Sequence, residues 1–485
     1  MKQYVQIYID LPKQIKASIW FLICSFIQKA ISIITTPIFT RIMNASEYGE
    51  YNVFLSWLSI ITVIVSLNLF YEVFEQGIVK FSNEREVFAS SMQGLELTLI
   101  CIWGCLYGLL HEWWNKLFSL NTIQMIMLFL IIWTTAIYNF WAVEQRAKYE
   151  YKKLVIITLI TSFLIPFIGI ILVTISKDKV TARIVSMAII QLLSYLGLFI
   201  VQEKKGKVFY HRFFWKYALS MNIVLIPHYL SQTVLNSADR IMISRLVGEN
   251  EAGIYSLAYS ISLVMAIFNL TLNQTIGPWY FNKIKDKSIE EIGKIVYPSM
   301  MLIAFVNIGL IMFAPEIVKI FAPKSYYDAK WIIPPIAMSV FFTFLYDIFG
   351  KFEFYYEKTK TIAVITLIGA LLNIVLNVFF IRMFGYRAAA YTTLICYIVY
   401  AGLHYISMAH ICKIELCGIQ PFNVKKIAVI SGLFLIAGFM IQISYNSIIL
   451  RISIIVVSFI ILIVWRKRIV NYFKSMYYIR KNKLI

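Results

Sequence analysis

The sequence predicts an all-α membrane protein that crosses a lipid bilayer about fourteen times. Sixty per cent of its 485 residues are hydrophobic, only 14% are charged, and the mean hydropathy is +0.75. A soluble protein is roughly half apolar, so a soluble fold could not bury this much apolar surface. A helix needs about 20 mainly apolar residues to cross ~30 Å of hydrocarbon, and apolar runs of that length recur along the whole chain.

The expected spans follow from apolar runs separated by polar breaks. Their centres lie near Ile27, Ile61, Ile102, Trp133, Leu164, Leu192, Tyr229, Val264, Phe305, Val340, Ala370, Tyr397, Leu435 and Val457. The first run follows three lysines, as in a signal peptide, but it is longer than a signal sequence and many spans follow it. We expect it to be retained as a span.

The distribution of cations predicts the orientation in the membrane. Assigning the 45 Lys and Arg residues to alternate sides places 31 on the side of the N-terminus and 13 on the other, with Lys29 inside the first span. Cytoplasmic loops retain Lys and Arg. We therefore expect both termini in the cytoplasm. The net charge of +20 is explained by topology, so nucleic acid is not an expected partner.

No pattern for bond chemistry or a cofactor is present. The chain has no Gly-rich phosphate loop, no His-Glu metal motif and no nucleophile elbow, and its six cysteines lack metal-site spacing. We expect no catalytic residue, no metal and no cofactor. A membrane polymerase or ligase would need a long ordered loop, whereas no expected connection exceeds roughly twenty residues between spans of the usual length.

An internal repeat predicts two lobes of the same orientation. Arg41-Ile42-Met43 and Gly49 in the first part are echoed by Arg240-Ile241-Met242 and Gly253, at offsets of 199 and 204. Residues around the fifth and sixth spans recur around the eleventh and twelfth at similar offsets. Because each repeat contains six spans, both lobes have the same orientation, and a central cavity with alternating access follows.

The repeat and the charge pattern together give expected boundaries. These are a cytoplasmic N-terminal segment at 1–16, a six-helix lobe at 17–202, a cytoplasmic linker at 203–216, a second six-helix lobe at 217–411, two additional transmembrane helices at 412–465 and a basic cytoplasmic tail at 466–485.

Polar stripes on the expected helices mark candidate cavity walls, since polar side chains in lipid must face protein or water. In the first span, Ser25, Lys29, Ser32 and Thr36 share one face. In the seventh span, Asn236 and Asp239 follow His228 and Pro227, and the proline could break the helix. We expect His228 to be packed or interfacial like the other intramembrane histidines, and it is the one that we would test for proton coupling.

The second lobe carries further stripes. Asn269 and Asn273 share a face of the eighth span, while Thr343, Asp347 and Lys351 lie at i, i+4 and i+8 in the tenth. Thr366, Asn373 and Asn377 share one face of the eleventh span, at i, i+7 and i+11. Asp347 and Lys351 either neutralise each other as a local pair or line the cavity, where Asp347 would bind a coupling cation such as H⁺ or Na⁺.

Cations near the stripes suggest an anionic substrate. Lys29, Arg41, Arg240 and Arg382 would attract a multiply charged anion such as a pyrophosphate, because the guanidinium fork matches phosphate oxygens. The amide and hydroxyl stripes suit the hydroxyl groups of a sugar. The three arginines lie at span ends, so anchoring at the membrane interface is an equal alternative for them.

The segments from Arg41 to Tyr51 and from Asp239 to Ser256 resemble the Wzx-type polysaccharide flippases, a branch of the superfamily that includes the MATE exporters and lipid II flippases. The resemblance in layout covers essentially the whole chain: two six-span lobes and two extra C-terminal spans. It implies translocation of an undecaprenyl-pyrophosphate-linked oligosaccharide from the cytoplasmic to the periplasmic leaflet for O-antigen, capsule or exopolysaccharide assembly. Partners would be membrane lipids and polysaccharide polymerase or other assembly proteins.

Two other functions remain open from the sequence. A MATE-like antiporter for drugs or metabolites should favour acidic residues for cationic drugs, and the cationic bias of the candidate site argues against it. An O-antigen polymerase or ligase is the alternative of another class. The loop lengths disfavour it.

Overall fold

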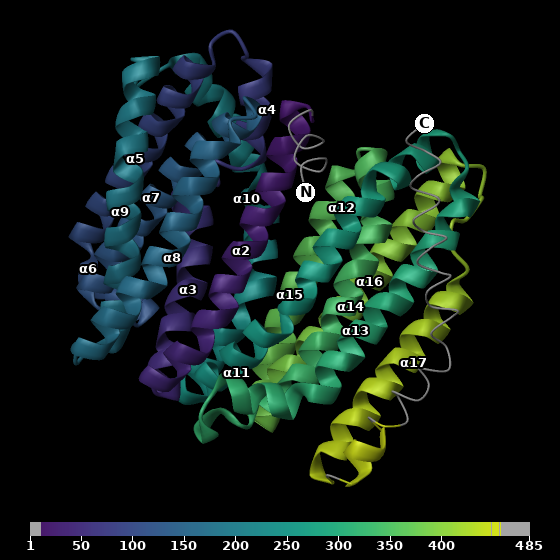
Figure 1. The fold of residues 1–485 in the computed structure, drawn as a ribbon. Helices are drawn as coiled ribbons and strands as arrows, with labels where there is room; N and C mark the ends of the chain where they lie inside the picture. Colours follow the sequence, from purple (N-terminus) through teal and green to yellow (C-terminus); the bar gives the residue numbers. More distant parts are fainter. Residues whose placement is uncertain (1–10, 448, 455, 457–485) are drawn as a thin grey trace, which may run out of the picture. The chain divides into compact units, whose positions relative to one another are not determined.

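The described part of the chain is built from α-helices joined by short turns (Figure 1). A computed structural model describes residues 11–447, 449–454 and 456. Twelve helical segments of this part are long and apolar enough to cross a membrane. Thirteen of the expected span centres lie within long helices, which confirms a polytopic helical membrane protein. The expected span near Val457 and the basic tail lie outside the described residues.

The long helices begin and end close to the expected breaks. They are α2 (Lys13–Ile42), α3 (Ala45–Val65), α5 (Arg85–Leu109), α7 (Thr122–Ala147), α8 (Tyr151–Ile175), α9 (Lys179–Gly206), α10 (Arg212–Leu246), α12 (Val264–Lys285), α13 (Ile292–Phe321), α14 (Ala329–Tyr355), α15 (Thr359–Phe384), α16 (Ala388–Glu415) and α17 (Val424–Ile443). Three shorter helices are α4 (Glu72–Lys80), α6 (His111–Phe118) and α11 (Glu249–Ser262). The hydropathy pattern did not predict α4 and α6.

The helices group into two compact units. Unit 1 comprises residues 1–253 and 321–323, and unit 2 comprises residues 254–320 and 324–485. The helix α10 packs on α3, α4 and α5 within unit 1. It runs without a break through Pro227, so that proline does not interrupt the helix. The lobe boundaries expected from the repeat stay a prediction.

An aromatic core holds unit 1 together where α4, α5, α7 and α10 meet. Phe74, Phe88, Phe140 and Phe214 are fully buried there. Phe74 packs edge-on against Phe140 with ring centroids 4.6 Å apart, a favoured geometry for aromatic pairs. Behind this core, α5, α7 and α9 lie side by side (Figure 1). The core explains why the short helix α4 forms: it covers apolar rings that would otherwise be exposed.

A capped turn separates α2 from α3. The Asn44 side chain accepts a hydrogen bond from the Glu47 backbone N–H, and the Glu47 carboxylate accepts one from the Asn44 N–H. This capping box satisfies two backbone donors that a helix start leaves unpaired. The same reciprocal pair, Asn121 and Gln124, starts α7. These side-chain caps stabilise the starts of both helices.

The starts of α3 and α11 touch at two glycines that the internal repeat relates. A Cβ on Gly49 would lie 1.9 Å from the Glu249 carbonyl oxygen, and one on Gly253 would lie 1.9 Å from the Ala45 oxygen. Only a hydrogen at each position allows this approach. The two repeat offsets differ by five residues because α10 continues further beyond Arg240 than α2 does beyond Arg41.

Unit 2 is organised around α14. This helix packs extensively on α16 and also contacts α12, α15 and α17. Most of its side chains are buried, including Phe341, Phe344 and Phe352. A helix that is apolar on all sides belongs inside a bundle. Polar residues carried by α14 are therefore either bonded inside the unit or exposed at a gap between its helices.

The glycine contact predicts a stability effect that depends on position. Gly49→Ala should lower the melting temperature of the purified protein, because the new methyl group meets backbone atoms and overpacking costs about 1–3 kcal/mol. Gly197→Ala, in α9, is the matched control, since nothing lies within 4 Å of its Cβ position. Thermal unfolding in detergent measures both variants. Equal melting temperatures for the two would contradict the close approach of α3 and α11.

Candidate functional site

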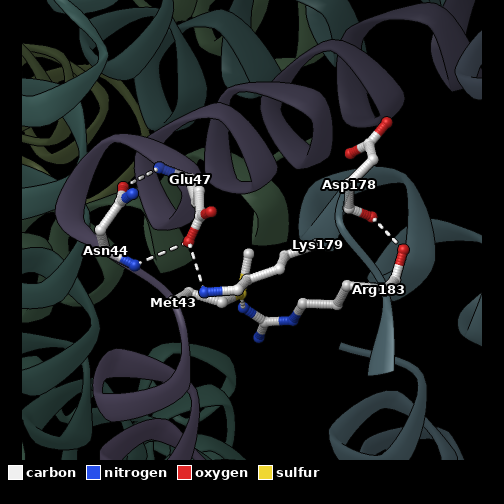
Figure 2. A network of polar contacts seen from close by, with 7 residues as sticks. Met43, Asn44, Glu47, Asp178, Lys179 and Arg183 are labelled. Atoms are coloured by element: carbon white, nitrogen blue, oxygen red, sulfur yellow. Dashed lines mark hydrogen bonds and ion pairs between the residues drawn. The ribbon is translucent and has the colours of Figure 1, made fainter. Parts of the chain in front are cut away.

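The motif after α2 builds a rigid junction in unit 1 (Figure 2). The Glu47 carboxylate, already bonded to Asn44, lies 3.5 Å from the Lys179 ammonium at the start of α9. The Arg183 guanidinium, one turn further along α9, donates to the Met43 sulfur at 3.6 Å. Residues 43 to 47 therefore tie the turn between α2 and α3 to α9.

Aromatic rings enclose the arginine of this junction. The Arg183 guanidinium carbon lies 3.7 Å from the ring centroids of both Phe39 and Tyr51. A guanidinium stacked between two rings is stabilised by cation–π attraction while it remains largely desolvated. Arg41 takes no part in this arrangement: its side chain is exposed and donates to the Pro37 carbonyl at 2.7 Å.

The polar stripe of α2 is exposed. Lys29 lies near the middle of the helix with Ser25 and Ser32 on the same face, and all three side chains are exposed. A cation exposed to hydrocarbon at this depth would cost several kcal/mol. The stripe therefore requires water or a polar ligand beside it, whereas a packed helix surface would have buried it.

A second polar face lies on α10. Asn236 and Gln232 are exposed, and the Arg240 guanidinium, which is half-buried, donates to the Asn236 carbonyl at 3.4 Å. Asp239 is buried at 2% exposure. Arg240 rather than Asp239 thus continues the exposed face. His228 is half-buried and stands beside Tyr229, whose hydroxyl donates to Glu72 at 3.3 Å.

Unit 2 brings five of the predicted polar residues together between α12 and α14. The Asn273 side-chain N–H donates to the Asp347 carboxylate at 2.9 Å. The Lys351 ammonium donates to the side-chain oxygen of the same amide at 3.2 Å. Asn269 donates to the Val340 carbonyl and the Thr343 hydroxyl. Asp347 and Lys351 thus share Asn273 as a bridge. Asn273, Asp347 and Lys351 are half-buried, which leaves this cluster accessible.

The other predicted polar residues of unit 2 lie elsewhere. Arg382 is exposed two residues before the end of α15. Asn373 and Asn377, which the stripe of α15 placed on a cavity wall, are fully buried: Asn377 donates to Asn373 at 3.2 Å and accepts a hydrogen bond from Thr392 of α16. The bond between Thr392 and Asn377 joins α16 to α15. No group of three His, Cys, Asp or Glu side chains suited to a metal lies in the described part of the chain.

A buried acid–base pair, which the sequence pattern did not predict, joins α14 to α16. His404 on α16 and Glu353 on α14 are 2% and 0% exposed, and the His404 Nδ1 lies 2.7 Å from a Glu353 carboxylate oxygen. Tyr346 stacks on the imidazole, and Tyr400 packs edge-on against it. The Tyr400 hydroxyl is 3.1 Å from that of Thr366. The two residues are 51 positions apart, so no local pattern could reveal the pair.

Two protein-family models match this chain. Residues 15–285 match the model described as polysaccharide biosynthesis protein, which is more than half of the chain. Residues 225–379 match the MatE model. The second match begins inside α10 and ends inside α15.

Curated relatives are distant. The chain is 22% identical over 377 residues to an uncharacterized membrane protein of Haemophilus influenzae, covering 74% of this chain and 88% of the relative. It is 25% identical over 217 residues to a Haloferax volcanii protein described as "Probable low-salt glycan biosynthesis flippase Agl15", covering 44% of this chain and 45% of the relative.

Solved structures share the fold. The lipid II flippase MurJ, in an inward closed conformation, aligns with a TM-score of 0.65 at 15% identity over 90% of this chain and all of the other. An inward-facing multidrug resistance MATE family transporter of the MOP superfamily aligns with a TM-score of 0.60 at 12% identity, covering 80% of this chain and 96% of the other. The all-α, multi-pass membrane fold expected from the sequence is therefore confirmed, and it is similar to the folds of MurJ and the MATE transporters.

The buried pair predicts a non-additive stability effect. Glu353→Leu alone should destabilise the protein by about 1–3 kcal/mol, because it leaves the buried imidazole without its partner. The double variant Glu353→Leu/His404→Phe removes both polar groups and should recover most of the loss. Thermal unfolding of both single variants and the double variant completes the cycle. Additive losses would contradict a direct interaction.

Proposed function

Because this chain belongs to the polysaccharide biosynthesis protein family, we propose that it moves a lipid-linked oligosaccharide from one leaflet of a membrane to the other. The observation that carries the proposal is the exposed cationic stripe of α2, with Lys29 between Ser25 and Ser32. A pyrophosphate supplies the opposite charge, and a sugar supplies hydroxyl groups for the neighbouring side chains. The family match and the multi-pass fold support this substrate class.

The proposed transport step uses binding and reorientation without bond chemistry. The headgroup enters from the cytoplasmic side, where Lys29 and Arg240 hold the pyrophosphate, and Arg41 and Arg382 add positive charge at the helix ends. The amides of Asn236 and Asn273 are the ones available to sugar hydroxyls, whereas Asn269, predicted with them, is 4% exposed and bonded inside unit 2. The prenyl chain stays in lipid. We place the protein in the inner membrane with both termini cytoplasmic, and O-antigen, capsule or exopolysaccharide assembly is its proposed context.

Coupling to an ion gradient has its best candidate in Asp347. Its carboxylate is half-buried, accepts from Asn273 and is bridged through that amide to Lys351. Binding of H⁺ or Na⁺ to this carboxylate would raise the net charge of the cluster by one unit. A site that binds the ion more tightly in one conformation shifts the equilibrium toward that conformation. Asp239 is almost fully buried, and His228 lies beside Tyr229 on α10, so both are weaker candidates.

The cationic stripe predicts where lipid-linked saccharide accumulates in cells. In a strain lacking this protein, Lys29→Ala or Arg240→Ala should leave the intermediate on the cytoplasmic leaflet, because the pyrophosphate loses its counter-charge, whereas wild type relieves the accumulation. Lys29→Arg should retain function. Lys324→Ala, an exposed cation after α13, is the control. Single repeat units that face outward but fail to polymerise would point to a polymerase instead.

The Asp347 cluster predicts the loss of gradient dependence. With purified protein in vesicles, an imposed proton or sodium gradient should accelerate transport by wild type, and Asp347→Asn should abolish that acceleration. Asp328→Asn is a matched control, because Asp328 pairs with Arg387 at 2.7 Å outside the long helices. The MatE match over residues 225–379 makes an antiporter the competing function. Gradient-driven uptake of cationic dyes without saccharide transport would favour that function.

A further inference from the structure

A lysine-lined pocket lies in unit 1 where α2 and α8 both begin. It has a volume of about 470 Å³ and is separate from the exposed stripe around Lys29. Its lining comes from two segments of the chain: Lys13 and Lys16 at the start of α2, and Tyr149, Glu150, Tyr151, Lys152 and Lys153 at the turn between α7 and α8. Both segments belong to the side that the cation distribution assigns to the cytoplasm.

Specific contacts hold the two walls together. The Lys13 ammonium donates to the Lys148 carbonyl at 3.4 Å, and Trp20 stacks parallel to Tyr151 with ring centroids 6.5 Å apart. Tyr149 adopts a left-handed backbone conformation with φ of 54°, which turns the chain sharply between the helices. A non-glycine residue in that region costs free energy that the surrounding structure must offset.

A chain of buried polar contacts holds the turn between α7 and α8 in place. The Lys148 ammonium pairs with Glu144 at 2.5 Å, and the other oxygen of that carboxylate accepts from Gln202 of α9 at 2.9 Å. Gln202 in turn accepts from Gln93 of α5 at 2.7 Å. This chain of hydrogen bonds fixes the end of α7 to α5 and α9. The lysines that follow the turn therefore project from a fixed base.

The pocket concentrates positive charge. Among the residues that the structure describes, four lysines and one carboxylate, Glu150, line it. Topology alone needs positive charge on this side of the membrane, but it does not need lysines from two segments around one cavity. Bringing like charges together costs Coulomb energy. A multiply charged anion in the pocket would offset that cost.

Exposed apolar faces begin at the pocket and run along both helices. On α2 the exposed residues Ile15, Ile19, Leu22 and Phe26 recur at helical spacing, and on α8 the exposed residues are Ile156, Ile160, Phe163 and Phe167. The two helices lie side by side (Figure 1). The first residues of each helix line the pocket. An amphiphile with an anionic head and a long apolar tail matches this combination.

We propose that this pocket is an entry site that binds the pyrophosphate headgroup of the lipid-linked saccharide before the headgroup reaches Lys29. The assignment rests on the proposed function. A pyrophosphate diester carries more negative charge than a phospholipid phosphodiester, so it matches four lysines and one carboxylate better. The prenyl tail lies along the exposed faces of α2 and α8.

Binding of undecaprenyl pyrophosphate without sugar tests the entry site. The purified full chain in phosphatidylcholine nanodiscs is titrated with this lipid at fixed ionic strength. The pocket variant Lys13→Gln/Lys152→Gln/Lys153→Gln should bind about tenfold more weakly than wild type, since it loses three of the four cations. The matched control, Lys204→Gln/Lys205→Gln/Lys207→Gln, loses the same charge near the end of α9 and should stay within twofold of wild type.

A conservative variant separates charge from folding. Replacing the same three pocket lysines by arginine should preserve affinity, and thermal unfolding verifies that all variants fold. Equal weakening of the pocket and control variants would overturn the proposal, because general surface charge would then explain binding. Equal affinity for phosphatidylglycerol would also overturn it and would identify a resident phospholipid site. Inorganic pyrophosphate, which lacks a tail, should bind much more weakly than the lipid.

The binding and transport measurements distinguish a failure of the entry site from a failure of the flippase function. If wild type binds the lipid through the pocket but transports no saccharide in vesicles, the entry site stands and the flippase function fails. If transport occurs and the pocket variant binds and transports like wild type, the flippase function stands and the entry site fails.

Discussion

The structure depends on one constraint: inside a membrane, every polar side chain needs a partner in the protein or water beside it. The described helices divide their polar residues accordingly. His404 of α16 pairs with Glu353 of α14 inside unit 2. Asn377 of α15 accepts a hydrogen bond from Thr392 of α16. Both contacts join neighbouring helices of the unit. Lys29 is exposed on α2 and has to be satisfied by water or a ligand. This division separates structural polar groups from those that a transported headgroup can reach.

The repeat-related turns show how a motif can be diagnostic of a family and still serve structure. Gly49 and Gly253 allow α3 and α11 to approach each other, and Arg183 is stacked next to the same turn. Thr40, at the end of α2, donates to the Phe321 carbonyl at 2.6 Å. These contacts concentrate at helix ends. The middle of α2, which carries Lys29, is left uncovered, as a ligand-binding face requires.

Much of the fold could be predicted from the sequence, but the partners of polar residues could not. Apolar runs of span length located the helices, because hydrocarbon thickness sets their length. Helical periodicity placed Asn373 and Asn377 on one face without showing that α16 covers it. It also grouped Asp239 with Asn236, whereas Arg240 shares the exposed face. Pairs such as Glu353 and His404 come from distant segments, so only tertiary packing reveals them.

As proposed, the protein moves a lipid-linked saccharide between leaflets without any other protein. The most direct measurement reconstitutes purified wild-type protein into vesicles that contain a polyprenyl-pyrophosphate saccharide in the inner leaflet only. A glycosidase that cannot cross the membrane then reports the saccharide that reaches the outer leaflet. If the protein is a flippase, release should increase with the amount of protein, and protein-free vesicles should show only slow spontaneous release. Release at the same slow rate with and without protein would contradict it.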